Sequence, residues 1–242
     1  MDKFEFKEET ETAIINIMGK KGSGKTYASG ELAKYLLNEG YSVYMDAFGT
    51  QLKKIIMLFF GVSKTNFDKA AKGGTELKER IKRLYLYIYK NSVKNSGRKY
   101  YLKNIDADKN INKEIEKDSE YIGRFIKDKD VRKILQYTGT EIIRKIDPAF
   151  FTEALKRKLK KIKNAADYII ISDCRFINEY EMLNKEFQNV KNFYITSDET
   201  GDNDKHISET EINQITAIYG NEIVTVKNDK NKILDAGTFK LF

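Results

Sequence analysis

Short apolar runs of strand length occur near both ends of the chain and are missing from its middle. The expected strands are AIINIM (13–18), YSVYM (41–45), DYIIISD (167–173), VKNFYIT (190–196) and EIVTV (222–226). Between the first two runs, apolar residues recur at helical spacing from Lys25 onward, and Gly40 supplies a stop. Parallel strands joined by such a helix need a right-handed crossover and helices on both faces of the sheet.

The region from 51 to 150 is predicted to be mainly helical. One helix is indicated by an apolar face formed by Leu77, Ile81, Leu84, Tyr85 and Ile88. Another is expected over 128–144, and Asp147-Pro148 supplies an N-cap and a first-position proline for a third. The stretch 91–120 is rich in Lys, Asn, Asp and Ser, so we expect it to be loop-like and mobile.

Together these patterns predict an α/β fold. The core, a doubly wound parallel sheet, takes residues 1–50 and 151–242, and a mainly helical insertion takes 51–150. A chain of 242 residues is long enough for this arrangement.

The composition tells more about where the protein works than about any reaction that it catalyses. Cys174 is the only cysteine, so an intrachain disulfide and a cysteine zinc cluster are excluded, and a buried structural thiol is expected. The N-terminus lacks signal-peptide features, and the longest apolar run, 55–62, is too short to span a bilayer. A net charge of +8 favours anionic partners without choosing among them.

The segment GKKGSGKT follows the first strand and matches the phosphate-binding loop G-x-x-x-x-G-K-[ST]. Its glycines let backbone N–H groups converge on phosphate oxygens at a helix N-terminus. Lys25 is expected to reach the β- and γ-phosphates, and the Thr26 hydroxyl to bind Mg²⁺. The expected ATP-binding residues are Gly19, Gly22, Ser23, Gly24, Lys25 and Thr26.

Asp173 ends the apolar strand 167–173, where a buried parallel strand meets the ligand crevice. A carboxylate at this position can hold Mg²⁺ directly or through water, as a Walker-B acid does. It can also cap the helix that follows. We favour the metal role because the phosphate-binding loop is present.

A polar stripe is expected on the helix over 128–144. The stripe consists of polar residues that recur every four positions: Arg132, Gln136, Thr140 and Arg144. A solvated helix face is one explanation. A site for a phosphate and a base edge is the other, since arginine makes forked contacts to phosphate. The periodicity leaves both open.

Four further segments resemble phage deoxynucleoside monophosphate kinases. RKILQYTGTEIIRK (132–145) is similar to that family's R-x-x-L-Q-x-x-G-T-x-x-x-R segment, and IIISDCRFINE (169–179) to its strand-D-x-R-F-x-N-E segment. AFGTQLK (47–53) is similar to A-F-A-D-P-L-K, and KHISE (205–209) to H-x-S-E near the lid. With the loop, they follow the family's order from 19 to about 210. The chain departs from the family at Thr26, where members often carry Asp, and at Thr50-Gln51, which replaces Asp-Pro.

The resemblance implies a P-loop NMP kinase fold with a lid at about 196–210. ATP and Mg²⁺ would occupy the loop, a deoxynucleoside monophosphate (dNMP) would bind between core and insertion, and the products would be the diphosphate (dNDP) and ADP. The implied acceptor residues are Arg132, Gln136, Thr140, Arg144 and Arg175, with Phe48 and Lys53 nearby. Lys25, Arg132, Arg144 and Arg175 would be catalytic. His206 and Glu209 are lid candidates, although an exposed loop histidine explains His206 equally well.

Two other functions use the same loop. A P-loop ATPase acting on nucleic acid would account for the basic run LKRKLKKIK (155–163), but it should carry a hydrolytic glutamate where Cys174 stands. A nucleotide-binding interaction module would not need the full set of Lys25, Thr26 and Asp173. We therefore expect small-molecule substrates, no stable nucleic-acid or membrane binding, and a monomer or homodimer. The resemblance places the protein in the cytoplasm, that of an infected bacterial host if it comes from a phage.

Overall fold

The computed structural model describes residues 11–67, 70, 74–92, 108–197, 207–228 and 239. The chain divides into two compact units. The first unit comprises Met1–Phe48 and Leu155–Phe242, and the second comprises Gly49–Ala154. The role of the second unit as an acceptor-binding insertion stays a prediction. The lid at about 196–210 also stays a prediction, since residues 198–206 lie outside the described part.

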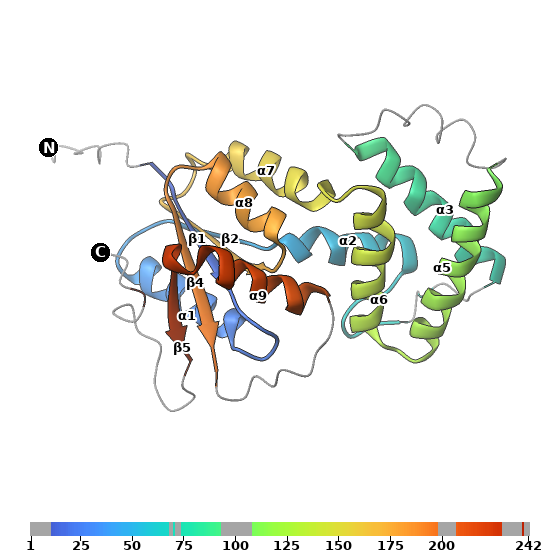
Figure 1. The fold of residues 1–242 in the computed structure, drawn as a ribbon, viewed down its shortest axis with the longest axis horizontal. Helices are drawn as coiled ribbons and strands as arrows, with labels where there is room; N and C mark the ends of the chain where they lie inside the picture. The colour runs from blue at the N-terminus through green and yellow to red at the C-terminus, as the bar shows by residue number, and fades with distance from the viewer. Residues whose placement is uncertain are drawn as a thin grey trace, which may run out of the picture. The chain divides into compact units, whose positions relative to one another are not determined.

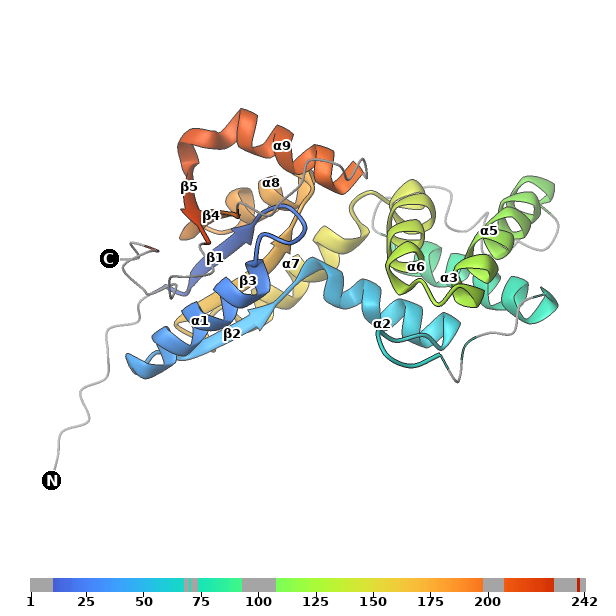
Figure 2. The ribbon, with the colours of Figure 1, turned by 90° about the horizontal axis from the view of Figure 1, so that it is seen from below.

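The first unit is built on a five-stranded, fully parallel sheet in the order β2-β3-β1-β4-β5 (Figure 1 and Figure 2). The strands are β1 (Ala13–Met18), β2 (Val43–Asp46), β3 (Tyr168–Cys174), β4 (Val190–Thr196) and β5 (Ile223–Lys227). All five predicted strands are present, which confirms the α/β class. β1 lies at the centre, with partners on both sides, so the segment that follows it emerges in the middle of the sheet's carboxyl edge.

Helices cover both faces of this sheet because successive strand residues point to opposite sides. Ile15, Ile17 and Ile170 pack against α1 (Lys25–Asn38) on one face. Ile14 and Ile169 pack on the other face against α8 (Ile177–Glu186), α9 (Ile207–Tyr219) and the part of α7 (Phe150–Ile162) from Leu155 on. Cys174 is buried in this second layer, as expected for a structural thiol.

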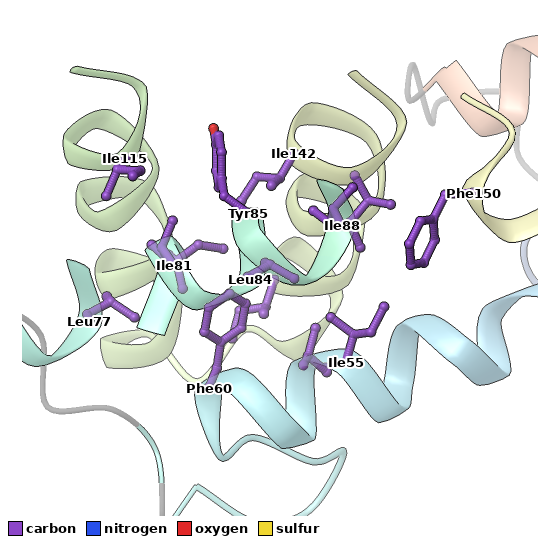
Figure 3. Packing of buried hydrophobic residues seen from close by; sticks show 14 of the residues in the cluster. Ile55, Phe60, Leu77, Ile81, Leu84, Tyr85, Ile88, Ile115, Ile142 and Phe150 are labelled. Atoms are coloured by element: carbon purple, nitrogen blue, oxygen red, sulfur yellow. The ribbon is translucent and has the colours of Figure 1, made fainter. Parts of the chain in front are cut away.

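The described part of the second unit contains helices and their connections, and no strand. Its elements are α2 (Phe48–Phe60), α3 (Gly74–Asn91), α5 (Lys109–Lys127), α6 (Val131–Tyr137), a π-helical segment η1 (Thr138–Arg144) and the first turn of α7. The predicted apolar face of α3 is confirmed: its residues are buried and meet Ile55 and Phe60 of α2, Ile115 of α5 and Ile142 of η1 (Figure 3).

Two local predictions are wrong. The stretch 109–120 is not a loop, because α5 covers it and Asp108 caps that helix by accepting from the backbone N–H groups of Asn110 and Ile111 (2.9 and 3.1 Å). Polar composition hid the helical spacing of buried Ile111, Ile115 and Ile122; the remainder, 93–107, lies outside the described residues. Pro148 is also not the first helical residue, since it lies in a turn and α7 begins at Phe150.

No helix among the described residues is both long and apolar enough to cross a bilayer.

Candidate active site

The glycine-rich loop leaves the end of β1 and leads directly into α1. Gly19 has φ 150° and lies so close to β4 that a Cβ there would stand 2.5 Å from the carbonyl oxygen of Ile195. Gly24 is the N-cap of α1, with φ 85° in the left-handed region that favours glycine. The N-cap of α1 makes no side-chain hydrogen bond to the helix, because glycine has no side chain. A loop that leads into a helix N-terminus in this way has the backbone geometry that can bind an anion.

Lys25 is 8% exposed, and its ammonium lies over the loop. The Nζ donates to the carbonyl oxygen of Lys20 at 2.5 Å, and Ser23 N donates to the same oxygen at 3.2 Å. The buried hydroxyl of Ser23 has no hydrogen-bond partner among the described residues. Thr26, one residue further on, is exposed. The loop thus places one cation and one accessible hydroxyl beside the amides of a helix N-terminus.

Asp173 lies at the same edge of the sheet, because Met18 of β1 pairs with Cys174 of β3. Its Oδ1 accepts from the backbone N–H of Phe48 at 2.6 Å, the first residue of α2. The N-cap position of α8 belongs to Phe176 and not to Asp173. At the start of α8, the N–H groups of Arg175 and Phe176 donate to Glu179 Oε2 (2.8 and 3.2 Å). A carboxylate has two oxygens and several lone pairs, so the Phe48 contact is compatible with a metal role.

The residues present fit Mg²⁺, which prefers oxygen ligands and usually keeps one or two protein groups together with phosphates and waters. The Thr26 hydroxyl and the Asp173 carboxylate are oxygen donors of this kind. Within the described residues no group of three or more His, Cys, Asp or Glu side chains is arranged to hold a metal.

The basic run on α7 is matched by carboxylates of the first unit. Lys158 Nζ lies 2.5 Å from Asp46 Oδ2 at the end of β2, and this hydrogen bond raises the pKa of Lys158 above its ordinary value. Lys156 and Lys160 both contact Glu186, at 3.4 and 2.7 Å. The run therefore has a structural explanation that requires no nucleic acid.

The polar stripe occupies α6 and η1 of the second unit. Arg132, Gln136, Thr140 and Arg144 are all half-buried, whereas Lys133, Glu141 and Lys145 are exposed and Ile134, Thr138 and Ile142 are buried. Burial thus repeats every four residues. In an α-helix four residues exceed one turn, and in the wider π-helix they fall short of one. Side chains spaced by four residues therefore shift around the helix in one direction along an α-helix and in the opposite direction along a π-helix. Because α6 is followed by a π-helical segment, the two shifts offset each other and all four polar residues stay on one face.

The packing around the stripe is tight. A Cβ on Gly139 would lie 2.9 Å from Leu52 Cδ2, so α2 rests directly on the backbone of η1. The Arg144 guanidinium lies 5.0 Å from the centroid of the Phe151 ring. Gln51, one of the departures from the family pattern, donates to the Tyr87 hydroxyl at 3.1 Å. Aromatic packing and close helix contact therefore restrict how Arg144 and Gln51 can turn.

The remaining predicted residues fall in different places. Phe48 is 4% exposed and packed in the core of the first unit, while Arg175 is half-buried directly after β3. Lys53 is exposed on α2. His206 lies outside the described residues, and Glu209 is in α9 with a side chain that is not described. The first unit therefore carries the loop, Asp173 and Arg175; the second carries Lys53 and the stripe.

Sequence reasoning missed three residues at this edge of the sheet: Glu179, Lys158 and Asn228. Glu179 is 1% exposed and occupies the third position of α8, a position where an acidic residue signals a helix start. Lys158 was hidden within a basic run. Asn228 follows the last strand and donates from Nδ2 to the carbonyl oxygen of Ser23 at 3.0 Å. Its place after a parallel strand was the only available signal.

A glycine-rich loop at the end of the central strand of a five-stranded parallel sheet is an arrangement typical of nucleotide-binding proteins of the α/β class. The family model described as deoxynucleotide monophosphate kinase matches residues 13–232. The chain belongs to this family, and it is an enzyme that phosphorylates a deoxynucleotide monophosphate. No curated protein matches the chain.

Proposed function

We propose that ATP is the phosphoryl donor and that its γ-phosphoryl passes to a dNMP, giving dNDP and ADP in the presence of Mg²⁺. The observation that carries the proposal is the arrangement of Lys25 over a glycine loop at the uncapped N-terminus of α1. Such a loop binds the phosphates of a nucleotide through backbone N–H groups and a cation.

On the donor side, Lys25 exchanges its bond to the Lys20 carbonyl for bonds to the β- and γ-phosphates. Thr26 and Asp173 would hold Mg²⁺, which supplies positive charge to the phosphate oxygens when bound. The α1 amides bind and orient the β-phosphate. Their geometry is set before the nucleotide arrives, so little reorganisation accompanies transfer.

On the acceptor side, Arg132, Arg144 and Arg175 bind the phosphate of the dNMP. Gln136 and Thr140 supply neutral hydrogen bonds for the sugar or base, and Phe48 and Lys53 support the same substrate. The transition state of phosphoryl transfer is loose and spreads negative charge over the moving group, so positioning and cations suffice. No covalent intermediate is needed. A lid at about 196–210 with His206 and Glu209 would exclude water and so limit ATP hydrolysis.

The lysine-rich run on α7 favours no other function, since Asp46 and Glu186 bind three of its lysines. We propose a monomer or homodimer that acts on small molecules without stable nucleic-acid binding. On the family resemblance we also propose that it comes from a bacteriophage and works in the cytoplasm of the infected bacterium.

The test is to incubate the purified protein with ATP, Mg²⁺ and each of the four common dNMPs in turn, and to separate the products. Formation of ADP together with a deoxynucleoside diphosphate is expected for at least one acceptor. Omitting Mg²⁺, and replacing ATP by GTP, test the metal and the donor separately. Phosphate release stimulated by DNA, with no diphosphate from any monophosphate, would contradict the proposal and favour the nucleic-acid ATPase.

A further inference from the structure

Asn228 connects the end of the sheet to the phosphate-binding loop. It directly follows β5, and its backbone N–H donates to the carbonyl oxygen of Thr196, the last residue of β4, at 2.7 Å. Its side-chain Nδ2 donates to the carbonyl oxygen of Ser23 at 3.0 Å, although the two residues stand 205 positions apart. The backbone of Asn228 is thus held by β4, and its side chain reaches the backbone of the loop.

The side chain of Asn228 also lies close to the next residue of the loop, Gly24. A Cβ built on Gly24 would lie 1.9 Å from Asn228 Nδ2 and 3.1 Å from its Cγ. Asn228 is half-buried. The amide therefore packs against the bare backbone of Gly24, and a side chain at position 24 would displace it.

This contact controls the direction of an N–H group. The carbonyl of Ser23 and the N–H of Gly24 belong to one planar trans peptide, in which the two bonds point in opposite directions. When Asn228 binds the carbonyl, the Gly24 N–H must face away from Asn228. Glycine adopts positive and negative φ with similar ease, so this peptide could otherwise turn over at low cost.

We propose that Asn228 is a positioning residue for nucleotide binding: its amide fixes the Ser23–Gly24 peptide so that the Gly24 N–H points at the β-phosphate. The inference rests on the proposed binding of ATP in the loop. Asn228 acts through the loop backbone and touches neither reacting group. Nucleoside di- and triphosphates should both depend on it, because both carry the β-phosphate, whereas adenosine should not.

Binding of ATP, ADP and adenosine to the full chain, measured calorimetrically without any acceptor, tests this inference. Asn228→Ala should weaken ATP and ADP about tenfold, the effect of losing one hydrogen bond, and leave adenosine unchanged. Asn228→Asp keeps the shape of the side chain but replaces the donor by a charged acceptor beside Ser23 O, so a loss of roughly a hundredfold is expected. Asn221→Ala, on the exposed 3₁₀ segment Gly220–Glu222, is the matched control.

Kinetics supply a second readout that a merely structural role would not move. KM for ATP should rise in both Asn228 variants, while KM for the dNMP stays at the wild-type value. The midpoints of thermal unfolding are compared first for all variants. If Asn228→Ala lowers the midpoint, the test relies on the isosteric Asn228→Asp alone.

Unchanged ATP affinity in Asn228→Asp would overturn the inference. An equal loss for ATP and adenosine would overturn it too, because it would place Asn228 at the base. A wild-type protein that binds no ATP overturns both the donor assignment and this role. A protein that binds ATP normally but phosphorylates no dNMP overturns the proposed acceptor chemistry alone.

Discussion

The phosphate-binding loop and the polar stripe both offer anion-binding groups, but they are built differently. The loop is one continuous segment whose donors are mainly backbone N–H groups, shaped by Gly19 and Gly24 and by contacts to β4 and Asn228. The stripe consists of four half-buried side chains on α6 and η1, so its polar groups belong to side chains and not to the backbone.

The difference decides how each site can fail. A backbone site is spoiled by any change that alters a peptide direction or adds a methyl group, even where no charge is lost. A side-chain site loses one interaction at a time and leaves the fold intact. We therefore expect substitutions in the loop to couple binding to stability, and substitutions in the stripe to separate them.

The largest effect is expected for Lys25→Met, which keeps the aliphatic stem and removes the cation. On the proposal that this charge stabilises the transition state, we expect kcat to fall roughly a thousandfold, as for loss of a strong preorganised electrostatic donor. Steady-state kinetics with saturating ATP and dNMP measure it. Lys21→Met, at an exposed variable position of the same loop, is the control. An equal loss in both variants would show that the loop needs general positive charge and not a placed ammonium.

Arg144→Ala should break the acceptor site and spare the donor site. We expect kcat/KM for the dNMP to fall about a hundredfold, the scale of a lost charge-assisted contact in a closed site. Calorimetric ATP affinity should stay unchanged. Lys145→Ala removes a neighbouring exposed cation paired with Glu114 and should change neither value. Retained turnover at ordinary dNMP concentrations in Arg144→Ala would remove this arginine from the site.

Gly24→Ala should show the coupling expected of a backbone site. A non-glycine residue in the left-handed region costs about 1–2 kcal/mol of unfolding free energy, and the added Cβ also displaces Asn228. The free energy of unfolding measured in urea and the affinity for ATP should therefore both decrease. Gly30→Ala is the opposite control: this helical glycine of α1 has open space around it, so alanine should stabilise by up to about 1 kcal/mol. A Gly24→Ala protein that binds ATP normally would contradict the comparison.

The smallest effect is a pH dependence confined to the second unit. Asp118 is 2% exposed and accepts from the hydroxyls of Tyr85 (2.8 Å) and Tyr137 (2.9 Å), and burial raises the pKa of its carboxyl. The folded state thus keeps the proton to a higher pH than the unfolded state. Stability from this group is complete below the ordinary carboxyl pKa, about 4, and is lost as pH rises through the raised value.

Asp118→Asn should remove that part of the slope in thermal melts between pH 4 and 8. Asp128→Asn, at the exposed end of α5, should keep the wild-type slope. ATP affinity at a fixed pH should be the same in all three proteins, since the network lies in the helical unit. A wild-type slope in Asp118→Asn would show that other groups set the pH dependence.

The parts of the fold that can be predicted are the helices and strands whose formation depends on residues close together in the sequence. The five strands followed from short apolar runs, and α1 and α3 from apolar spacing. α5 is hard to recognise in the sequence, because its polar composition masks the helical spacing of Ile111, Ile115 and Ile122. The π-helical segment could not be foreseen, because the strict spacing of four is equally compatible with a slowly wrapping α-helix.

The glycine-rich loop between β1 and α1 is predictable for the same local reason, since consecutive residues set the course of its backbone. The partners of its side chains are not. The sequence indicates that Asp173 binds a metal or caps the next helix, and in the structure one of its oxygens also accepts a hydrogen bond from the backbone N–H of Phe48, 125 residues away.

The sequence by itself determined the strands, the loop and the four-residue spacing of the stripe, because local backbone preference and periodicity act between near neighbours. Only the tertiary structure decided which distant groups meet: Asn228 with Ser23, Asp173 with Phe48, and buried Asn16 with Asn192 across β1 and β4. Many asparagines and aspartates could have made such hydrogen bonds equally well. The order of strands in the sheet selects among them, because it alone brings particular strand ends and faces within reach.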